Sequence, residues 1–273
     1  MKVFEPDIDM PGFEAQLRKK ILKEGQDKTP DGFIFDGIDD IKFGWHNDDF
    51  IKNNYTVITK YKYRPDMNIS EYNFQKLIAD LFNVKDLSQL HTLLDFEYKE
   101  LFEVGKDSST IFHQRFYDKY RAGWPKMEQL YNDLIHDRVA KWYNEPIIYQ
   151  RFPTFRVALP GNIAVGKFHT DAEFGHPAGE VNYVIPLTDS DGTASIWVES
   201  IPGAMDYAPL KLRIGELIKF PGNTCSHGNM INKTGLTRCS MDFRVLPMSM
   251  YKGGGESITM KTKFIIGEYY KEL

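Results

Sequence analysis

The sequence predicts an α+β fold in which helices flank a core of antiparallel strands. One observation is that about the first 145 residues carry apolar side chains mainly at helical spacing. The other is that, from Pro146 on, short apolar or alternating runs are separated by Gly, Pro, Asn and Asp. No linker-like composition divides the halves. We therefore expect one domain with a mostly helical flanking region 1–145, a β-core 146–250 and a C-terminal extension 251–273.

Three amphipathic helices are expected in the first half. Ser70 is a favourable N-cap for the first of them, and Trp124-Pro125 separates the second from the third, because proline is favoured at a helix start. Between Gly32 and Tyr63, aromatic and β-branched residues predict short strands. The apolar positions of the three helices are Phe74, Leu77, Ile78, Leu81 and Phe82; then Ile111, Phe112, Phe116 and Tyr120; then Met127, Leu130, Tyr131, Leu134 and Ile135.

Seven strands are expected in the second half. Their number, shortness and turn-rich connections are typical of a double-sheet jelly roll or a barrel. The expected strands are Ile147–Gln150, Phe155–Leu159, Ile163–His169, Val181–Leu187, Ala194–Val198, Glu216–Phe220 and Thr237–Val245.

The bulk properties indicate a globular cytoplasmic protein with a small-molecule partner. A formal charge of -4 over 273 residues argues against nucleic-acid binding, which favours a basic face. We expect no membrane partner, because no apolar run approaches the roughly 18 residues of a membrane span and the N-terminus lacks a signal-peptide pattern. The two cysteines, Cys225 and Cys239, are expected to remain thiols in a reducing compartment. A homodimer is left open.

The main chemical signal is His169-Thr170-Asp171, followed by His227. On a strand, residues two apart share a face, so His169 and Asp171 can point at one ion as the strand ends. The 58 positions from His169 to His227 leave room for about four strands, and the turn signal before His227 predicts that it opens another. Two imidazoles and a carboxylate can bind one face of Fe(II) and leave the other face open. His176, in a loop, is an alternative ligand.

Arg238 and Ser240 follow His227 on the last expected strand. Alternation puts Arg238, Ser240, Asp242 and Arg244 on one face, and Cys239 on the opposite, packing face. A buried arginine needs a partner, and a carboxylate-bearing cosubstrate would supply one. For Arg244 we favour a salt bridge, to Asp242 or elsewhere.

These residues resemble the non-haem iron(II), 2-oxoglutarate-dependent oxygenases, in particular the StrG-like branch named after a streptomycin-biosynthesis protein, distantly related to phytanoyl-CoA hydroxylase. The resemblance covers roughly residues 152–247 and leaves out the helical N-terminal part. The strings that carry it are Phe168-His169-Thr170-Asp171, Gly175-His176-Pro177-Ala178-Gly179-Glu180-Val181-Asn182, Ile196-Trp197-Val198-Glu199-Ser200, His227-Gly228-Asn229, and Thr237-Arg238-Cys239-Ser240-Met241-Asp242-Phe243-Arg244.

The resemblance implies a double-stranded β-helix, or jelly roll, with flanking helices. It implies Fe(II) on His169, Asp171 and His227, with 2-oxoglutarate and O2 as cosubstrates. Arg238, assisted by Ser240, would bind the far carboxylate of 2-oxoglutarate, and succinate and CO2 would be products. Because Asp171 is present where related halogenases carry a small residue, hydroxylation or a related oxidation is expected. The family setting suggests a biosynthetic enzyme acting on an aminoglycoside-like sugar, a cyclitol or an amino-acid derivative.

Three further residues are candidates near such a site. Asn182 could donate a hydrogen bond to 2-oxoglutarate or to substrate. Trp197 and Glu199 share a strand face and could bind substrate. Their alternatives are a core aromatic for Trp197 and an ion pair with Arg213 or Lys211 for Glu199. The stretch 43–49 is either a lid or a solvated loop.

Two other functions are compatible with the same residues. A cupin-like metal-dependent hydrolase or isomerase could use zinc or manganese at the triad and would not need Arg238. A non-catalytic small-molecule-binding protein would keep the sandwich without the chemistry, although an intact triad argues against it.

Overall fold

The computed structural model describes residues 72–94, 110–161, 168–199, 202–205, 207–258 and 261–273, together with the backbone of 56–60. Within these ranges the chain is α+β with antiparallel sheets, which confirms the predicted class. Ser70, the stretch 43–49 and most of the strand expected from Ile163 lie outside the described residues.

The described strands form two antiparallel sheets. Their bounds are β1 (Thr56–Lys60), β2 (Ile147–Gln150), β3 (Thr154–Ala158), β4 (Val181–Pro186), β5 (Ile196–Val198), β6 (Ala208–Pro209), β7 (Glu216–Phe220), β8 (His227–Asn229), β9 (Arg238–Pro247) and β10 (Tyr270–Glu272). The large sheet has the order β1-β7-β4-β9-β2-β10, and β3 pairs with the first half of β9. The small sheet has the order β6-β5-β8. The predicted strands are thus confirmed to within a few residues, except Ile163–His169, which lies mostly outside the described residues.

One predicted strand begins later than expected. Gly192–Ala194 forms a 3-10 turn, whose first amide, Gly192 N, donates to the side chain of Asp191. The strand therefore starts at Ile196 and not at Ala194. Aspartate side chains commonly capture a following backbone amide in this way, in competition with a strand ladder.

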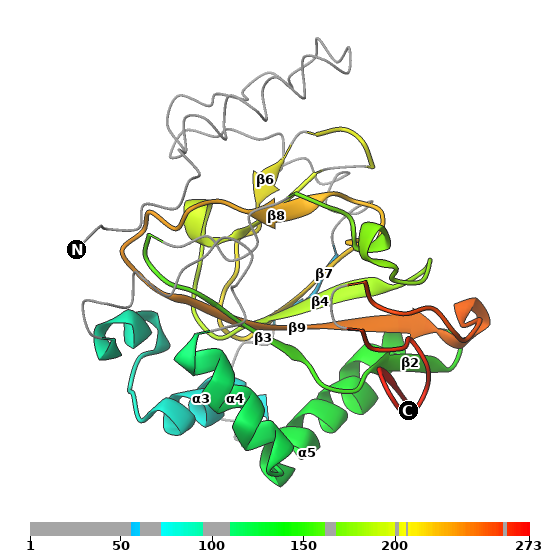
Figure 1. Ribbon diagram of the computed structural model, residues 1–273, viewed down its shortest axis with the longest axis horizontal. Coiled ribbons are helices and arrows are strands. Elements are labelled where there is room, and N and C mark those ends of the chain that lie inside the picture. The colour runs from blue at the N-terminus through cyan, green and yellow to red at the C-terminus, as the bar shows by residue number, and fades with distance from the viewer. Residues whose placement is uncertain are drawn as a thin grey trace.

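Figure 1 shows three layers: the small sheet with β6 and β8, the large sheet with β4 and β9, and helices beneath the large sheet. Apolar side chains from β4, β5, β7 and the segment after β6 fill the space between the two sheets, and Cys225 is among them. Both cysteines are free and buried. Among the described residues, no helix has the length and apolar character needed to cross a membrane.

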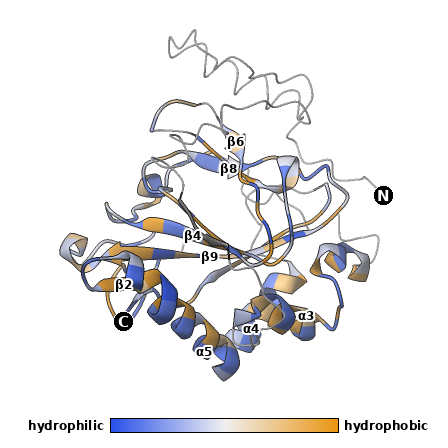
Figure 2. Ribbon diagram, turned by 180° about the vertical axis from the view of Figure 1, so that it is seen from behind, coloured by the Kyte–Doolittle hydropathy of each residue, from blue (hydrophilic) through white to orange (hydrophobic). Residues whose placement is uncertain are grey.

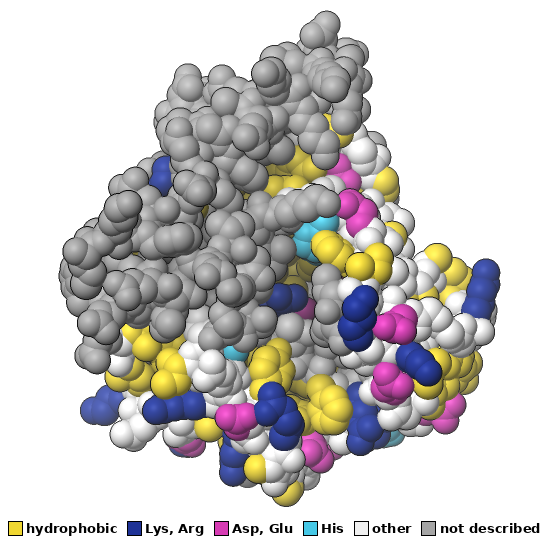
Figure 3. All heavy atoms as spheres, in the orientation of Figure 1, with side chains coloured by type: hydrophobic (Ala, Val, Ile, Leu, Met, Phe, Trp, Pro, Cys, Tyr) yellow, Lys and Arg dark blue, Asp and Glu magenta, His cyan; other side chains and the backbone are white. Residues whose placement is uncertain are grey.

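The helical layer contains α3 (Phe74–Phe82), α4 (Ile111–Arg121) and α5 (Pro125–Leu134). The N-terminus of each helix is fixed by a residue next to it or at its first position. Asn73 accepts the amide of Lys76 before α3, Thr110 accepts that of His113 before α4, and proline opens α5 as predicted. Figure 2 shows hydrophilic and hydrophobic residues alternating along these helices. Most of their predicted apolar positions are buried in the core shared with the sheet, but Leu77 and Leu81 are half-buried, and Ile111, at the start of α4, is 39% exposed. On the face in Figure 3, basic and acidic side chains are interspersed over this layer.

The alternation predicted for β9 separates its apolar side chains from its polar ones. Cys239, Met241, Phe243 and Val245 belong to the core that the sheet forms with the helices. Arg238, Ser240, Asp242 and Arg244 therefore point to the opposite face, toward the small sheet. A buried polar row is thus enclosed between two sheets.

The ring of Phe155, on β3, packs between the large sheet and the helices. Its ring stacks on Phe116 at 4.6 Å and on Phe82 at 5.9 Å between ring centroids. We expect Phe155→Ala to lower the free energy of unfolding by about 3–5 kcal/mol, because it removes a buried aromatic ring and leaves a cavity. Urea unfolding measures this loss.

Phe152→Ala is the matched control. Phe152 is 45% exposed and contacts Tyr120 edge-on at 5.1 Å, so its loss should cost about 1 kcal/mol. Equal losses for the two variants would contradict the assignment of Phe155 to the core.

Candidate metal centre

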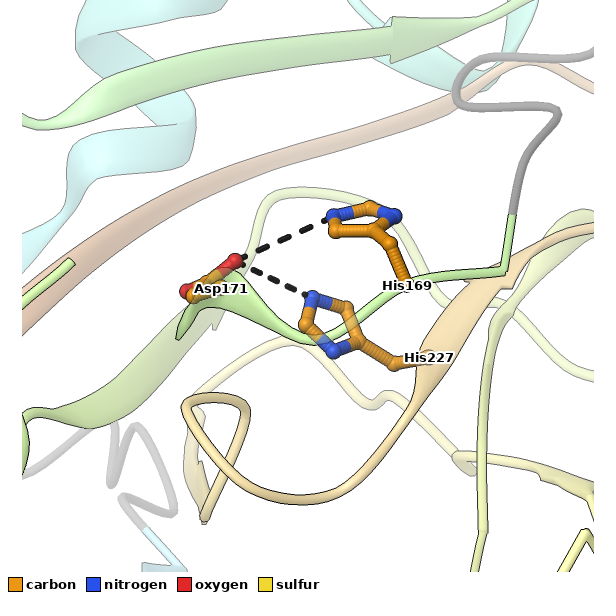
Figure 4. A group of neighbouring side chains, drawn as sticks. All are labelled: His169, Asp171 and His227. Atoms are coloured by element: carbon orange, nitrogen blue, oxygen red, sulfur yellow. Dashed lines mark ion pairs between the residues drawn. The ribbon is translucent and has the colours of Figure 1, made fainter. Parts of the chain in front are cut away.

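His169 and His227 are placed by a short antiparallel bridge between two chain segments. The amide of His169 donates to the carbonyl of His227 at 3.0 Å, and the reverse bond measures 2.8 Å. Residues paired in this way point their side chains to the same side of a sheet. Both imidazoles consequently face one point, as Figure 4 shows. His227 opens β8, as predicted, after the four described strands β4 to β7.

Asp171 reaches the same point from a tight turn. A 3-10 turn over Asp171–Phe174 begins with a capping box, in which Thr170 and Glu173 each bind the backbone of the other. The Asp171 amide donates to the carbonyl of Gly222 at 2.9 Å. The capping box and this hydrogen bond therefore hold the backbone of Asp171 in place, two residues after His169.

The three side chains form a compact buried group. Asp171 Oδ1 lies 3.8 Å from His169 Nε2 and 3.5 Å from His227 Nε2. One ligand atom from each residue lies within 4.8 Å of the others, and all three residues are buried. Among the described residues, this is the one cluster of histidine, cysteine and acidic side chains with such spacing. The donor set of two nitrogens and one oxygen fits a divalent transition metal.

His227 has the tautomer that metal binding requires. Its Nδ1 lies 3.1 Å from the carbonyl of Cys225, which can only accept, so Nδ1 carries the proton and Nε2 keeps its lone pair. Burial lowers the pKa of this imidazole to about 4, although Asp171 opposes the shift. The ring is thus neutral at physiological pH, the state in which it can bind a metal.

The second carboxylate oxygen of Asp171, Oδ2, accepts hydrogen bonds from two side chains. Arg244 Nε and Asn182 Nδ2 each lie 2.8 Å from Asp171 Oδ2. Burial alone would raise the pKa of the carboxyl, but the Arg244 guanidinium and His227 hold it well below the usual range. Asp171 is therefore an anion despite being 2% exposed.

Arg238 and Ser240 lie beyond the triad on the same face of β9. Both are buried. The Oγ of Ser240 has no hydrogen-bond partner among the described residues, although it is fully enclosed. A buried hydroxyl without a partner is costly and indicates a missing ligand or water. A cavity of about 60 Å³ is lined by Arg156, His169, Asp171, Asn182, Val184, Ile196, Phe220, His227, Gly228, Asn229, Arg238, Asp242 and Arg244.

Gly222 is required by the close approach of Asn182. A Cβ at position 222 would lie 2.6 Å from Asn182 Nδ2 and 2.9 Å from Phe220 Cε2. We expect Gly222→Ala to cost about 1–3 kcal/mol of unfolding free energy, because it overpacks this point. Part of that cost should disappear in Gly222→Ala/Asn182→Ala, since the shorter side chain makes room for the methyl group. Urea unfolding of the four proteins measures the coupling, and strictly additive losses would contradict it.

Three other candidates lie apart from the triad. The indole N–H of Trp197 donates to the carbonyl of Gly192 at 3.0 Å, and the ring is buried. Glu199 accepts the amides of Ser226 and Met205. His176 Nδ1 lies 2.6 Å from Glu180 Oε2, and its ring packs on Phe264. Trp197 and Glu199 do not line the triad cavity, and His176 is not part of the metal group.

Two arginines at the cavity were not singled out as site residues from the sequence. Arg156 faces the cavity from β3, opposite Ser240, and its Nε donates to Asp242 Oδ1 at 2.9 Å. Arg244 forms the expected salt bridge: its Nε lies 2.8 Å from Asp171 Oδ2, and its Nη1 lies 3.7 Å from Asp242 Oδ2. Alternation marked Arg244 as inward-facing; only the strand register identifies its partner.

Comparison with known proteins gives one sequence relative of high coverage. No family model matches the chain. The streptomycin biosynthesis protein StrG of Streptomyces griseus is 35% identical over 204 residues, covering 74% of this chain and 94% of StrG.

Solved structures show weaker similarity. The apo non-heme monooxygenase ThoJ has a TM-score of 0.42 at 9% identity, covering 77% of this chain and 82% of its own. HygX of Streptomyces hygroscopicus, with nickel and 2-oxoglutarate bound, has a TM-score of 0.33 at 14% identity, covering 46% and 67%. These scores are too low to define a shared fold, whereas the sequence identity to StrG is high and nearly spans that protein. The chain belongs to the family of the streptomycin biosynthesis protein StrG.

Proposed function

We propose that this protein is an Fe(II)- and 2-oxoglutarate-dependent oxygenase built on a double-stranded β-helix. The observation that carries the proposal is the buried group of His169, Asp171 and His227, which shares one cavity with Arg238. Two histidines and one carboxylate with open positions are typical of non-haem Fe(II) oxygenases. The two facing antiparallel sheets support the proposed architecture, since a jelly roll is a double-sheet fold.

When bound, Fe(II) would supply the oxidative decarboxylation of 2-oxoglutarate to succinate and CO2, coupled to oxidation of the substrate by O2. The protein's own contribution is binding and exclusion of water. His227 offers Nε2 because its Nδ1 proton is held by Cys225 O. The triad lies between two sheets, with each member at most 9% exposed. Such burial keeps bulk water from the reacting groups.

Arg238 is proposed to bind the far carboxylate of 2-oxoglutarate, with Ser240 as a second donor. An arginine can bind a carboxylate through two parallel N–H bonds, and this geometry also fixes the orientation of the ligand. Ser240 lies two residues further on the same strand face, and its buried hydroxyl lacks a partner among the described residues. A ligand carboxylate would accept a hydrogen bond from this hydroxyl and from the Arg238 guanidinium.

The substrate is proposed to be a small polar metabolite of a biosynthetic pathway: an aminoglycoside-like sugar, a cyclitol or an amino-acid derivative. The support is the relation to StrG, whose name places it in streptomycin biosynthesis. The carboxylate of Asp171 further favours hydroxylation or a related oxidation, because it occupies the ligand position that a halide would need.

The test is succinate formation from 2-oxoglutarate by purified protein with Fe(II), ascorbate and O2. Turnover without added substrate that disappears in His227→Ala would support the proposal. A second readout needs no turnover: anaerobic Fe(II) and 2-oxoglutarate should give a weak visible charge-transfer band. Zinc has a filled d shell and cannot give this band. Absence of both succinate and the band would favour a metal-dependent hydrolase or a binding protein.

A further inference from the structure

We propose that Asn182 and Arg244 form a clamp on Asp171 that makes this aspartate a one-oxygen ligand of the metal. Both donors occupy Oδ2, at 2.8 Å each, whereas Oδ1 faces the two histidine Nε2 atoms. The clamp rests on the proposed function, since it concerns how the same metal would be held. Both residues would act on the metal through Asp171, so both are positioning residues.

The clamp is built from a cross-strand pair. Asn182 on β4 lies directly opposite Arg244 on β9 in the register of the large sheet. Side chains of such a pair stand close together on one face, and here both converge on a single oxygen. The pair lies on two interior strands of the large sheet, between β7 and β2. The direction of the Asp171 carboxylate is therefore set by the sheet and not by the turn alone.

The orientation of the Asn182 amide is set by its hydrogen bond to Asp171. A carboxylate only accepts hydrogen bonds, so Nδ2 must face Asp171 Oδ2, and the amide cannot flip without losing this bond. The remaining group, Oδ1, is an acceptor that finds no partner among the described residues. The second N–H of Nδ2 remains, so the contact with 2-oxoglutarate or substrate expected from the sequence stays a prediction beside the bond to Asp171.

Arg244 is held in two directions at once. Its Nε donates to Asp171, and its Nη1 lies 3.4 Å from Gln150 Oε1 and 3.7 Å from Asp242 Oδ2. A planar guanidinium presents donors in fixed, divergent directions, whereas the ammonium group of lysine is a single point. Arg244→Lys therefore keeps the charge near Asp171 but cannot keep both contacts.

The clamp would determine how many coordination positions of the metal remain open. An octahedral ion that accepts one atom from each of His169, Asp171 and His227 keeps three positions open. A 2-oxo acid that chelates through its carboxylate and keto oxygens fills two, and one remains. If Asp171 bound through both oxygens, that last position would be lost. By occupying Oδ2, the clamp keeps it available.

The first experiment uses the wild-type protein loaded with Co(II) under anaerobic conditions. Co(II) has visible d–d absorption bands and is not oxidised during the measurement. A crystal structure of this complex should show Asp171 Oδ1 on the metal, with Oδ2 still bound by Asn182 and Arg244. Co(II) ligated by Oδ2 or by both oxygens would overturn the clamp. Absence of Co(II) at the triad would overturn the proposed function as well, so the two failures are distinguishable.

The second experiment compares Asn182→Ala and Arg244→Lys with the wild type. Each should weaken Co(II) affinity by about 10- to 100-fold, the usual effect of removing a group that orients a metal ligand. The visible Co(II) spectrum should also change, because added coordination by Asp171 weakens the d–d bands. Asn232→Ala is the control: Asn232 is equally buried and donates to the carbonyls of Ala158 and Leu236, away from the triad. It should leave the spectrum unchanged.

The wild-type Co(II) complex is the reference for an intact metal site. If a folded variant has the same Co(II) affinity and spectrum as the wild type, the substituted residue does not orient Asp171. A variant that does not fold leaves the other variant and the wild-type crystal structure to decide.

Discussion

Asp171→Ala is expected to abolish metal binding and to destabilise the metal-free protein, whereas His169→Ala should abolish binding with little loss of stability. The sequence alone predicts that both variants stay folded, because the β-core is apolar without these residues. The structure changes this expectation for Asp171. Its partner Arg244 is 7% exposed, and removing the carboxylate leaves a buried guanidinium without its close ion pair.

Breaking one side of a buried ion pair typically costs about 3–5 kcal/mol. Urea unfolding of the metal-free proteins measures the cost, and anaerobic Co(II) titration measures the binding. That loss would be a large fraction of the roughly 5–15 kcal/mol that stabilises a domain of ordinary size.

Asp171→Asn provides the control for shape. The amide keeps an oxygen that can accept from Arg244, so the stability loss should be smaller than with alanine, while metal binding is still lost with the negative charge. Equal unfolding free energies for Asp171→Ala and His169→Ala would contradict a stabilising role for the Asp171–Arg244 pair.

The secondary structure of the second half was predictable because its signals are local. Alternation on β9 correctly separated Cys239, Met241 and Phe243 from Arg238 and Ser240, since the period of a strand is fixed by backbone geometry. The strand boundary near Ala194 was wrong by two residues, because the side chain of Asp191 captures a backbone amide and starts a turn.

The triad was also within reach of the sequence. His169 and Asp171 are two residues apart at the end of an expected strand, and His227 follows a turn signal, so each could be placed by local rules. The clamp was not predictable in this way. It requires Asn182 on β4 to face Arg244 on β9, 62 positions further along the chain (244 − 182), and periodicity does not give the register of such a pair.

Trp197 and Glu199 show the opposite limitation. Their shared face was inferred from alternation, but alternation does not say what that face meets. In the structure Trp197 donates to the carbonyl of Gly192, and Glu199 ties two backbone amides together. Buried polar groups need partners, and here the backbone supplies them. The strand β5 has only three residues, and so short an alternation does not distinguish a side chain that lines the cavity from one that packs in the core.

Arg238→Ala is expected to weaken 2-oxoglutarate binding strongly while leaving the metal in place. Loss of a hydrogen bond to a charged group costs about 1.5–3 kcal/mol, or on the order of 10- to 150-fold in affinity. Ser240→Ala removes a neutral donor and should cost about 2- to 13-fold. Anaerobic titration of 2-oxoglutarate into the Co(II)-loaded proteins measures both. Arg238→Lys should fall between wild type and alanine, because lysine keeps the charge but not the bidentate geometry.

A ligand control separates this contact from general damage to the cavity. Pyruvate carries the 2-oxo acid group that chelates a metal but lacks the far carboxylate, so Arg238→Ala should leave its affinity unchanged. If 2-oxoglutarate affinity were also unchanged, another cavity arginine would have to bind the far carboxylate. Arg244 is held by Asp171 on the metal side, which leaves Arg156, whose guanidinium faces the same cavity and pairs with Asp242. Weakening of both ligands to the same degree would show instead that Arg238 supports the metal site and not the cosubstrate.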